Sequence, residues 1–169
     1  NLVSTLKSLQ KPPETFLSAS AIGFYGNCKP VECYESLESG HGFLADVCKE
    51  WEHEAFIAKE RNIRTIALRI GLVLGYEGGA MKKMLPPFWS GLGGSLGDGT
   101  QWMSWIHVKD LVDMMIHSIE NKSIEGSYNA VSPEPVTNKI FTKCLAKALK
   151  RPAFFPVPKI ALKFILGEM

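Results

Sequence analysis

Two short segments of the 169-residue sequence combine residue types that can bind or transform a ligand. In the first, Ser20 and Tyr25 lie in a stretch of mostly small residues, 18–26, that follows the run 15–17. If that run is a buried parallel strand, its carboxyl end lies at the ligand-binding edge of an open sheet. There a serine can donate a hydrogen bond to a substrate carbonyl, and a tyrosine can act as an acid. The alternative is that Ser20 forms a turn and Tyr25 packs as an aromatic with its hydroxyl satisfied.

The second segment is Trp105-Ile-His-Val-Lys-Asp, in which an aromatic ring, the His107 imidazole and the Asp110 carboxylate precede an expected helix. Asp110 suits the positive end of a helix dipole. His107 is either a base or a hydrogen-bonded structural residue, and its residue type leaves both open. Earlier in the chain, Arg69-Ile-Gly-Leu-Val ends another apolar run. Its backbone groups either meet a nicotinamide amide or simply end a strand.

Two further patterns do not predict sites. The glycine-rich run 91–97 has Leu96 where a dinucleotide-binding G-x-G-x-x-G would need glycine, so it predicts a tight loop with positive φ angles. Four cysteines are too few and too scattered for a disulfide framework, which predicts reduced thiols. The set Cys28, Cys33, His41 and Cys48 does not have the spacing of standard zinc ligands, and we therefore predict no metal site there.

Composition narrows the class of protein. Apolar residues make up 46% of the chain and charged residues 21%, which indicates a folded globular protein. Lys and Arg (19) nearly balance Asp and Glu (17), which argues against a nucleic-acid partner. No run of eighteen apolar residues and no signal-peptide pattern occurs. We therefore expect no membrane partner and a cytoplasmic location.

Periodicity predicts the elements that position these residues. Residues 15–20 read as a short buried strand and residues 63–70 as a second one. Between them, residues 43–60 predict an amphipathic helix, which makes the unit a parallel crossover. The apolar residues of this helix are Phe43, Val47, Trp51 and Ala55, and Trp51 is expected to pack on a sheet.

The second half of the chain predicts more helix than strand. Residues 75–99 read as a loop with a short helix, 101–106 as extended, 110–120 as a helix and 128–131 as a strand. Thr137 is the expected N-cap of a further helix, and a last apolar helix is expected to run to residue 169. Helix 110–120 is expected to bury Leu111, Met114, Met115 and Ile119. The apolar face expected for the next helix consists of Ile140, Phe141, Cys144, Leu145, Ala148 and Leu149.

In this order the segments resemble the carboxyl-terminal half of an extended short-chain dehydrogenase/reductase of the epimerase/dehydratase superfamily. The resemblance covers nearly the whole chain, from the serine segment and Arg69–Gly75 to Ile106-His-Val-Lys-Asp and Tyr128-Asn-Ala-Val. More narrowly, the chain resembles the epimerase-family (SulA-like) branch. The residues that carry this narrower resemblance are Gly42-Phe-Leu-Ala, Trp51-Glu52, Gly78-Gly-Ala-Met, Leu92-Gly-Gly and Ser104-Trp-Ile-His.

The resemblance implies an α/β fold: the distal half of a Rossmann-type parallel sheet plus part of a small helical substrate-binding lobe. It divides the chain into a Rossmann part, 1–75, a mixed segment, 76–132, and truncated substrate-lobe helices, 133–169. The implied cofactor is NADP, with NAD possible, and its phosphate-binding half belongs to an amino-terminal portion absent from this sequence. The implied function is that of an oxidoreductase or epimerase-like enzyme for an unidentified small carbonyl or sugar-like substrate.

The resemblance also implies roles for particular residues. Ser20, Tyr25 and His107 would be catalytic. The cofactor would lie against Ala19, Ser20, Arg69, Ile70, Gly71, Leu72 and Val73, and the substrate against Met81, Phe88, Gln101, Trp102 and Trp105.

One departure from the family weakens the enzyme hypothesis. The family's Tyr-x-x-x-Lys pair would fall at Leu44 and Cys48, or one residue on at Ala45 and Lys49, and neither register has the tyrosine. The alternative is a non-catalytic protein that keeps the fold for nucleotide sensing or regulation. A third interpretation is a half-domain paired or exchanged between chains, which would give a homodimer.

Overall fold

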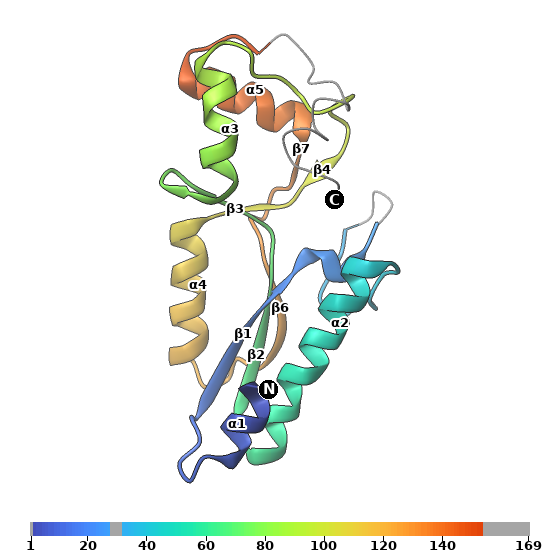
Figure 1. Cartoon of the computed structure of the whole chain (residues 1–169), viewed down its shortest axis with the longest axis vertical. Coiled ribbons are helices and arrows are strands. Elements are labelled where there is room, and N and C mark those ends of the chain that lie inside the picture. Colours follow the sequence, from blue (N-terminus) through green and yellow to red (C-terminus); the bar gives the residue numbers. More distant parts are fainter. Residues whose placement is uncertain (1, 28–31, 154–169) are drawn as a thin grey trace. The chain divides into compact units, whose positions relative to one another are not determined.

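The structure of the chain is a computed structural model that describes residues 2–27 and 32–153 (Figure 1). Its contacts divide the chain into two compact units. Unit 1 consists of Asn1–Gly71 and Val108–Val131, and unit 2 of Leu72–His107 and Ser132–Met169. The predicted segment boundaries at residues 75 and 132 stay predictions.

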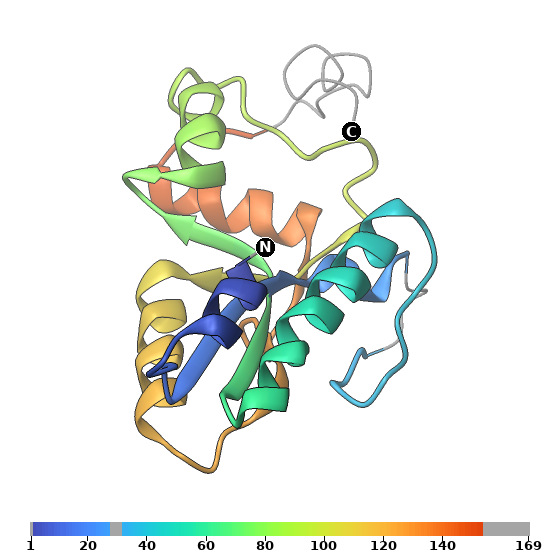
Figure 2. The same ribbon diagram turned by 60° about the horizontal axis from the view of Figure 1, so that its bottom comes forward.

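Unit 1 is built on a three-stranded parallel sheet with strand order β1-β2-β6. Helix α2 covers one face of this sheet and α4 covers the other, as both ribbon views show (Figures 1 and 2). The predicted parallel crossover through residues 15–70 is therefore confirmed. The elements of unit 1 are α1 (Leu2–Ser8), β1 (Thr15–Ala21), the 3-10 turn η1 (Ile22–Tyr25), α2 (Phe43–Phe56), the 3-10 turn η2 (Ile57–Arg61), β2 (Arg64–Ile70), α4 (Val108–Glu120) and β6 (Gly126–Ala130).

The strand register places polar residues in rows across the sheet. Ser20 of β1 is level with Arg69 of β2, which is level with Asn129 of β6. Two residues nearer the amino ends, Ser18 and Ser127 flank Ala67 in the same way. Because side chains alternate between the two faces of a strand, all of these residues share the face under α2.

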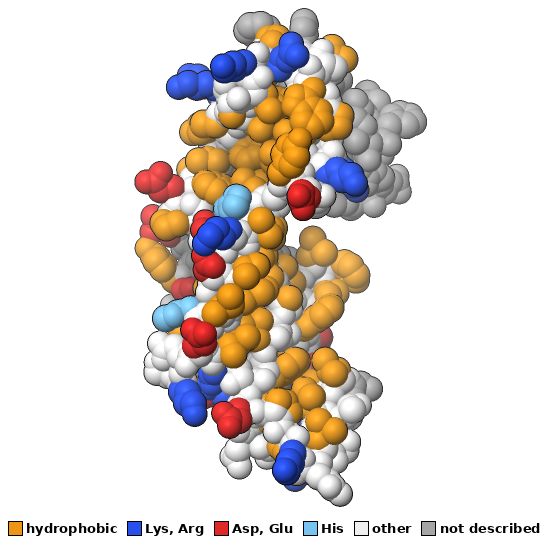
Figure 3. Space-filling view, turned by 90° about the vertical axis from the view of Figure 1, so that its left-hand side faces the viewer, with side chains coloured by type: hydrophobic (Ala, Val, Ile, Leu, Met, Phe, Trp, Pro, Cys, Tyr) orange, Lys and Arg blue, Asp and Glu red, His pale blue; other side chains and the backbone are white. Residues whose placement is uncertain are grey.

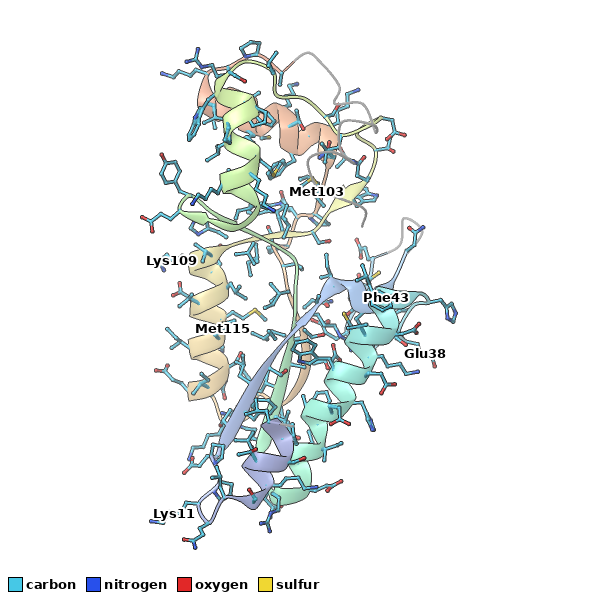
Figure 4. All side chains as sticks on the ribbon, in the orientation of Figure 1. Lys11, Glu38, Phe43, Met103, Lys109 and Met115 are labelled. Atoms are coloured by element: carbon cyan, nitrogen blue, oxygen red, sulfur yellow. The ribbon has the colours of Figure 1, made fainter. Side chains whose placement is uncertain are left out.

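Helix α2 turns a different side to the sheet from the one its apolar spacing predicts. Phe43, at its amino end (Figure 4), is 79% exposed and Trp51 is 59% exposed. Val47 is exposed as well, whereas Ala55 is buried as expected. The apolar side predicted for α2 is therefore mostly exposed, and the polar sheet face binds the Glu52 carboxylate instead. Trp51, the residue expected to pack on the sheet, does contact it, because its Nε1 donates to Ser18 Oγ of β1 at 3.3 Å.

The amino ends of the same strands are covered by apolar side chains. Val3 of α1, Ala58 of η2 and Ile63, which precedes β2, form a buried cluster. Phe16 of β1 packs against this cluster from the face that also carries Ser18 and Ser20. We call this group the amino-end cluster; it comprises Val3, Ala58 and Ile63 with the partly buried Leu6, Phe16 and Ile57.

Helix α4 is buried along only one side. Leu111 lies in the core as expected, but Ile119 is half exposed, which corrects its prediction as a core residue. Met115 points from α4 toward the strands (Figure 4). Hydrophobic side chains run down the face turned to the viewer in Figure 3, and the exposed ones contributed by α4 are Val108, Val112, Ile116 and Ile119.

Up to residue 153, where the described residues end, unit 2 contains two pairs of short strands and two helices. Strands β3 and β5 pair in parallel, and β4 and β7 pair antiparallel. No helix in the described ranges of either unit is long and apolar enough to span a membrane. The elements of unit 2 are β3 (Leu72–Gly75), α3 (Gly79–Trp89), β4 (Trp102–Met103), β5 (Trp105–His107), β7 (Val136–Thr137) and α5 (Asn138–Leu149).

The start of α5 is held by side-chain hydrogen bonds. Thr137 accepts a hydrogen bond from the Ile140 amide, which confirms the predicted N-cap. Asn138 is buried and accepts from the Leu96 amide at 2.7 Å. Of the apolar face predicted for α5, Phe141 is buried, whereas Ile140, Cys144 and Ala148 are exposed. The last apolar helix expected before residue 169 lies outside the described residues.

The glycine-rich run before β4 is a tight loop, as its sequence predicts. Gly91 and Gly97 have φ angles of 76° and 59°. A side chain on Gly93 would place its Cβ 2.5 Å from the Phe88 ring. The positive φ angles and the close approach to Phe88 explain the glycines of this loop, so their presence does not require a bound phosphate.

Candidate functional site

A single carboxylate, that of Glu52 on α2, joins all three strands of the unit 1 sheet. Its Oε1 accepts hydrogen bonds from Ser20 Oγ at 2.7 Å and Arg69 Nε at 2.9 Å. Its Oε2 accepts from Arg69 Nη2 at 2.9 Å and Ser127 Oγ at 2.9 Å. Two bonds on each oxygen fill the acceptor capacity of a carboxylate.

This ion pair is buried, and its surroundings set its charge state. Burial alone would raise the pKa of Glu52, but hydrogen bonds from Arg69, Ser20 and Ser127 and the Arg69 charge outweigh it, so the pKa is lowered. Burial likewise works to lower the pKa of Arg69, and the bonds to Glu52 and Tyr25 raise it overall. Both groups are therefore ionised at neutral pH.

The Arg69 guanidinium also holds the turn after β1. It lies 3.5 Å from the centre of the Phe24 ring, a cation–π contact, and its Nη1 donates to Tyr25 Oη at 2.9 Å. Tyr25 Oη in turn donates to Asn129 Oδ1 at 2.7 Å. Tyr25 is thus a buried aromatic with its hydroxyl satisfied, which is the structural alternative that the sequence left open.

Residues Cys33 and Glu35 fasten the following loop to the ends of β2 and β6. Asn129 Nδ2 donates to the Cys33 carbonyl, and the Asn129 amide donates to Glu35 Oε1, both at 2.9 Å. Arg69 Nη1 donates to the Glu35 carbonyl at 3.3 Å. The residues that build the network also position this loop.

The loop closes on itself at two glycines. The Gly40 amide donates to the Phe24 carbonyl at 2.9 Å. A Cβ on Gly40 would lie 2.1 Å from the Tyr25 carbonyl oxygen, and one on Gly26, whose φ is 62°, would lie 2.9 Å from the His41 carbonyl oxygen. Any side chain at either position would separate the two ends of the loop, so we call Gly26 and Gly40 the loop neck.

Leu44 and Cys48, one of the two registers expected for the missing Tyr-x-x-x-Lys pair, lie beside the turn that follows β1. Leu44 Cβ and Cys48 Sγ are each 3.7 Å from the point where a Cβ on Gly23 would be. Leu44 has no transferable proton. Burial raises the pKa of the Cys48 thiol, partly offset by a backbone hydrogen bond with Ala21.

The residues predicted to hold the cofactor are divided between the units. In unit 1, Ala19 is exposed and Ser20 is half-buried, whereas the Arg69 side chain is fully engaged within the network. The Gly71 amide donates to the Ala130 carbonyl at 3.1 Å. The cofactor roles of Ala19, Ser20, Arg69, Ile70, Gly71, Leu72 and Val73 stay predictions.

The residues predicted to contact substrate all belong to unit 2. Phe88 is buried against Gly93, whereas Trp102 is mostly exposed. Gln101 Nε2 donates to the Leu96 carbonyl at 3.0 Å. The substrate roles of Met81, Phe88, Gln101, Trp102 and Trp105, the catalytic role of His107, and a shared pocket near Ser20 stay predictions.

Sequence reasoning missed Glu52, Ser127 and Asn129 as members of the network. A usable signal was present, because Ser127 and Asn129 alternate in a strand, as Ser18 and Ser20 do in another. Period-two polar residues on neighbouring strands predict a polar sheet face. Such a face requires a polar partner, and Glu52 is the carboxylate that α2 supplies.

A parallel strand–helix–strand unit with its polar residues at the carboxyl ends defines an α/β protein of the Rossmann type. Comparison with known proteins gives the family. Residues 1–130 match the NAD dependent epimerase/dehydratase family, and this chain belongs to that family. Its relatives mark it as an atypical member of the short-chain dehydrogenase/reductase type.

Curated relatives support the assignment. The Arabidopsis thaliana "Epimerase family protein SDR39U1 homolog, chloroplastic" is 43% identical over 156 residues, which are 92% of this chain and 45% of that protein. Bacillus subtilis "Epimerase family protein YfhF" is 38% identical over 97% of this chain and 54% of its own length. The chain thus spans about half the length of these relatives.

Solved structures agree. The crystal structure of human epimerase family protein SDR39U1 (isoform2) with NADPH has a TM-score of 0.90 and 31% identity, over 99% of this chain and 57% of that chain. A nucleoside-diphosphate sugar epimerase from Corynebacterium glutamicum has a TM-score of 0.74 and 36% identity, over 99% of this chain and 37% of its own. The predicted fold class is confirmed.

Proposed function

We propose that the intact protein binds NADP(H) and acts as an oxidoreductase or epimerase-like enzyme on a small carbonyl or sugar-like substrate. The observation that carries this proposal is the half-buried Ser20 hydroxyl at the carboxyl end of β1, next to a buried, fully bonded ion pair. Open parallel sheets bind ligands at this edge. The NADPH complex of the human relative supports the choice of cofactor.

The chemistry of the edge residues fits the nicotinamide end of such a cofactor. Ser20 and the backbone around Gly71 are uncharged hydrogen-bonding groups, which suits an uncharged carboxamide. When bound, the nicotinamide supplies hydride chemistry. This chain's part would be to orient the ring and the substrate at the end of β1. The pyrophosphate would bind outside these residues, since the glycine-rich loop at 91–97 is not a phosphate fingerprint.

Proton transfer distinguishes this chain from a standard family member. Neither register of the expected pair, Leu44/Cys48 or Ala45/Lys49, has the tyrosine acid, and the Tyr25 proton is directed to Asn129. His107 is then the remaining predicted donor. Any turnover would be slow compared with an enzyme that has a positioned acid, whose contribution is about 10²–10⁴-fold.

Titration of the full-length protein with NADPH and NADH tests the proposal. We expect saturable binding of NADPH, seen as a change in nicotinamide fluorescence or as heat in calorimetry. A Lys11→Ala variant, altered at an exposed residue (Figure 4), serves as a matched control with unchanged affinity. Failure of both nucleotides to bind would contradict the proposal.

The second candidate is a non-catalytic nucleotide sensor, and Leu44 and Cys48 at the end of β1 favour it. NADPH binding without oxidation in the presence of aldehydes, ketones and nucleotide sugars would support the sensor over the enzyme. We also propose a homodimer, which sedimentation of the full-length protein would test. A single sedimenting species at the monomer mass would contradict the dimer.

A further inference from the structure

We propose that Ser20 acts toward its ligand as a hydrogen-bond acceptor, with Glu52 as the positioning residue that fixes this polarity. The site would then select an uncharged N–H or O–H donor at the end of β1, rather than the carbonyl that the sequence suggested. This inference rests on the proposed function, because it names the ligand chemistry of the same edge.

The first step is the direction of the Ser20 proton. An ionised carboxylate can only accept hydrogen bonds, so at 2.7 Å from Glu52 Oε1 the Ser20 hydroxyl must be the donor. A serine hydroxyl has one proton and two lone pairs. With its proton on Glu52, Ser20 Oγ keeps only acceptor capacity for a ligand.

The second step is that Glu52 does not readily release this proton. The Glu52 residue is only 5% exposed, and water cannot replace a lost bond there. A hydrogen bond to a charged carboxylate is stronger than one to a neutral carbonyl. If Ser20 turned to a ligand carbonyl, it would exchange the stronger bond for the weaker one and leave a buried lone pair unsatisfied.

The third step concerns the neighbouring donors in unit 1. Ser127 also donates to Glu52, Tyr25 donates to Asn129, and the Gly71 amide donates to the Ala130 carbonyl. These protons are already donated to acceptors within the protein, so they do not point to a ligand. Ser20 and Ser127 are both half-buried, but Ser20 is level with Arg69 and Asn129, two residues nearer the carboxyl ends of the strands than the row of Ser127. A ligand group that reaches Ser20 therefore meets an acceptor.

Two sources supply such a donor: the carboxamide of the nicotinamide and a hydroxyl of the substrate. The first experimental arm compares NADPH with its 3-acetylpyridine analogue, in which an acetyl group replaces the carboxamide and removes its N–H groups. If the carboxamide donates to Ser20, the full-length wild type binds NADPH about two- to ten-fold more tightly through this bond. Ser20→Ala then loses that part of the preference.

Ser127→Ala is the matched control. It removes one hydroxyl from the same carboxylate, as Ser20→Ala does, but from the row further inside the sheet. Both variants should lose similar stability in a thermal melt. Only Ser20→Ala should change the preference between the two nucleotides, a difference that a merely structural role of Ser20 would not produce.

The second arm compares cyclohexanol with cyclohexanone, by ligand-observed NMR on the full-length protein with and without NADPH. If a substrate hydroxyl donates to Ser20, the wild type prefers the alcohol and Ser20→Ala does not. Ser20→Cys replaces Ser20→Ala where the latter fails to fold, because a thiol is a much weaker acceptor than a hydroxyl.

The inference is overturned if Ser20 substitution changes the preference in neither arm, or if it increases a preference for the donor-bearing ligand. A Ser20-dependent preference in one arm supports it and identifies the source of the donor. If wild type binds no NADPH, the proposed function fails, and the alcohol–ketone comparison without cofactor then decides the inference by itself.

Discussion

The two ends of one sheet face, both in unit 1, are joined to their helices by opposite kinds of interaction. At the amino ends of the strands, the amino-end cluster excludes water with apolar side chains such as Val3 and Ile63. At the carboxyl ends, Glu52, Arg69 and Ser20 are joined by directional hydrogen bonds and charge. The amino-end cluster should therefore tolerate small changes in side-chain shape, whereas the carboxyl-end residues should not tolerate the loss of one hydrogen-bonding or charged partner.

The physical reason is the cost of leaving each kind of group alone. An apolar side chain that is shortened loses contact area and leaves a cavity, which the surroundings partly fill. A buried charge that loses its partner keeps its full desolvation cost. The carboxyl-end network therefore stabilises the fold only as a complete set, and the following predictions test this difference.

Arg69→Ala should have the largest effect. It leaves Glu52 buried without its cation, which costs about 3–5 kcal/mol of unfolding free energy by analogy with other broken buried pairs. Denaturant unfolding of the chain, followed by circular dichroism, measures the loss.

The double variant Glu52→Leu with Arg69→Met is the control for that prediction. Replacing both members with apolar residues removes the unpaired charge, so stability should recover to within about 1–2 kcal/mol of wild type. If the double variant is as unstable as Arg69→Ala, the ion pair stabilises the chain in a way that packing cannot replace.

Acid should weaken the carboxyl-end network next. The folded-state pKa of Glu52 is lowered, so its contribution is fully present above the unfolded pKa, near 4.5, and is lost as pH falls through the folded value. Denaturant midpoints measured from pH 7 down to pH 3 should fall in wild type. The Glu52→Leu/Arg69→Met variant should show a shallower decline, and equal slopes would show that other carboxylates dominate.

Ile63→Val probes the amino-end cluster and should cost less. Ile63 is fully buried, and removing one methylene from such a site costs about 0.5–1.5 kcal/mol. A matched Ile116→Val change on the exposed side of α4 should leave the unfolding midpoint within error. A larger loss at Ile63 than at Arg69 would reverse the comparison.

The smallest effect is expected from an exposed ion pair beside the amino-end cluster. Lys7 Nζ lies 2.6 Å from Glu60 Oε2, with both side chains partly in water. A double-mutant cycle with alanine at both positions should give a coupling of about 0.2–1 kcal/mol. A coupling comparable to that of Arg69 and Glu52 would mean that burial does not set the strength of these pairs.

The sequence predicted the parallel crossover well, because β-branched runs at 63–70 and turn residues around them are strong local signals. It did not predict that Phe43 and Val47 of α2 would be exposed while Glu52 is buried, since a period of four apolar residues indicates an apolar interior. What decided the orientation was non-local: Arg69 and Ser127 lie on strands that only the folded sheet brings under Glu52. A period of four along one helix contains no information about such partners.

The candidate site shows the same limit. Ser20 and Tyr25 were found from residue type and position after a strand, and both belong to the network. The polarity of their hydroxyls could not be predicted, because it depends on Glu52 and Asn129, which are distant in sequence. Residue type reveals which groups can donate, whereas the fold determines which of them still have a proton to give.

The loop neck at Gly26 and Gly40 has a consequence for the length of the chain between them. Because the neck is closed by backbone groups, residues inserted between Glu35 and Gly40 would leave in place both the neck and the bonds that join the loop to Asn129. Closing a flexible loop costs only about 0.6 kcal/mol more when its length doubles. This segment is therefore a place where the protein can gain residues, or receive an engineered insertion, while β1 and α2 keep their positions.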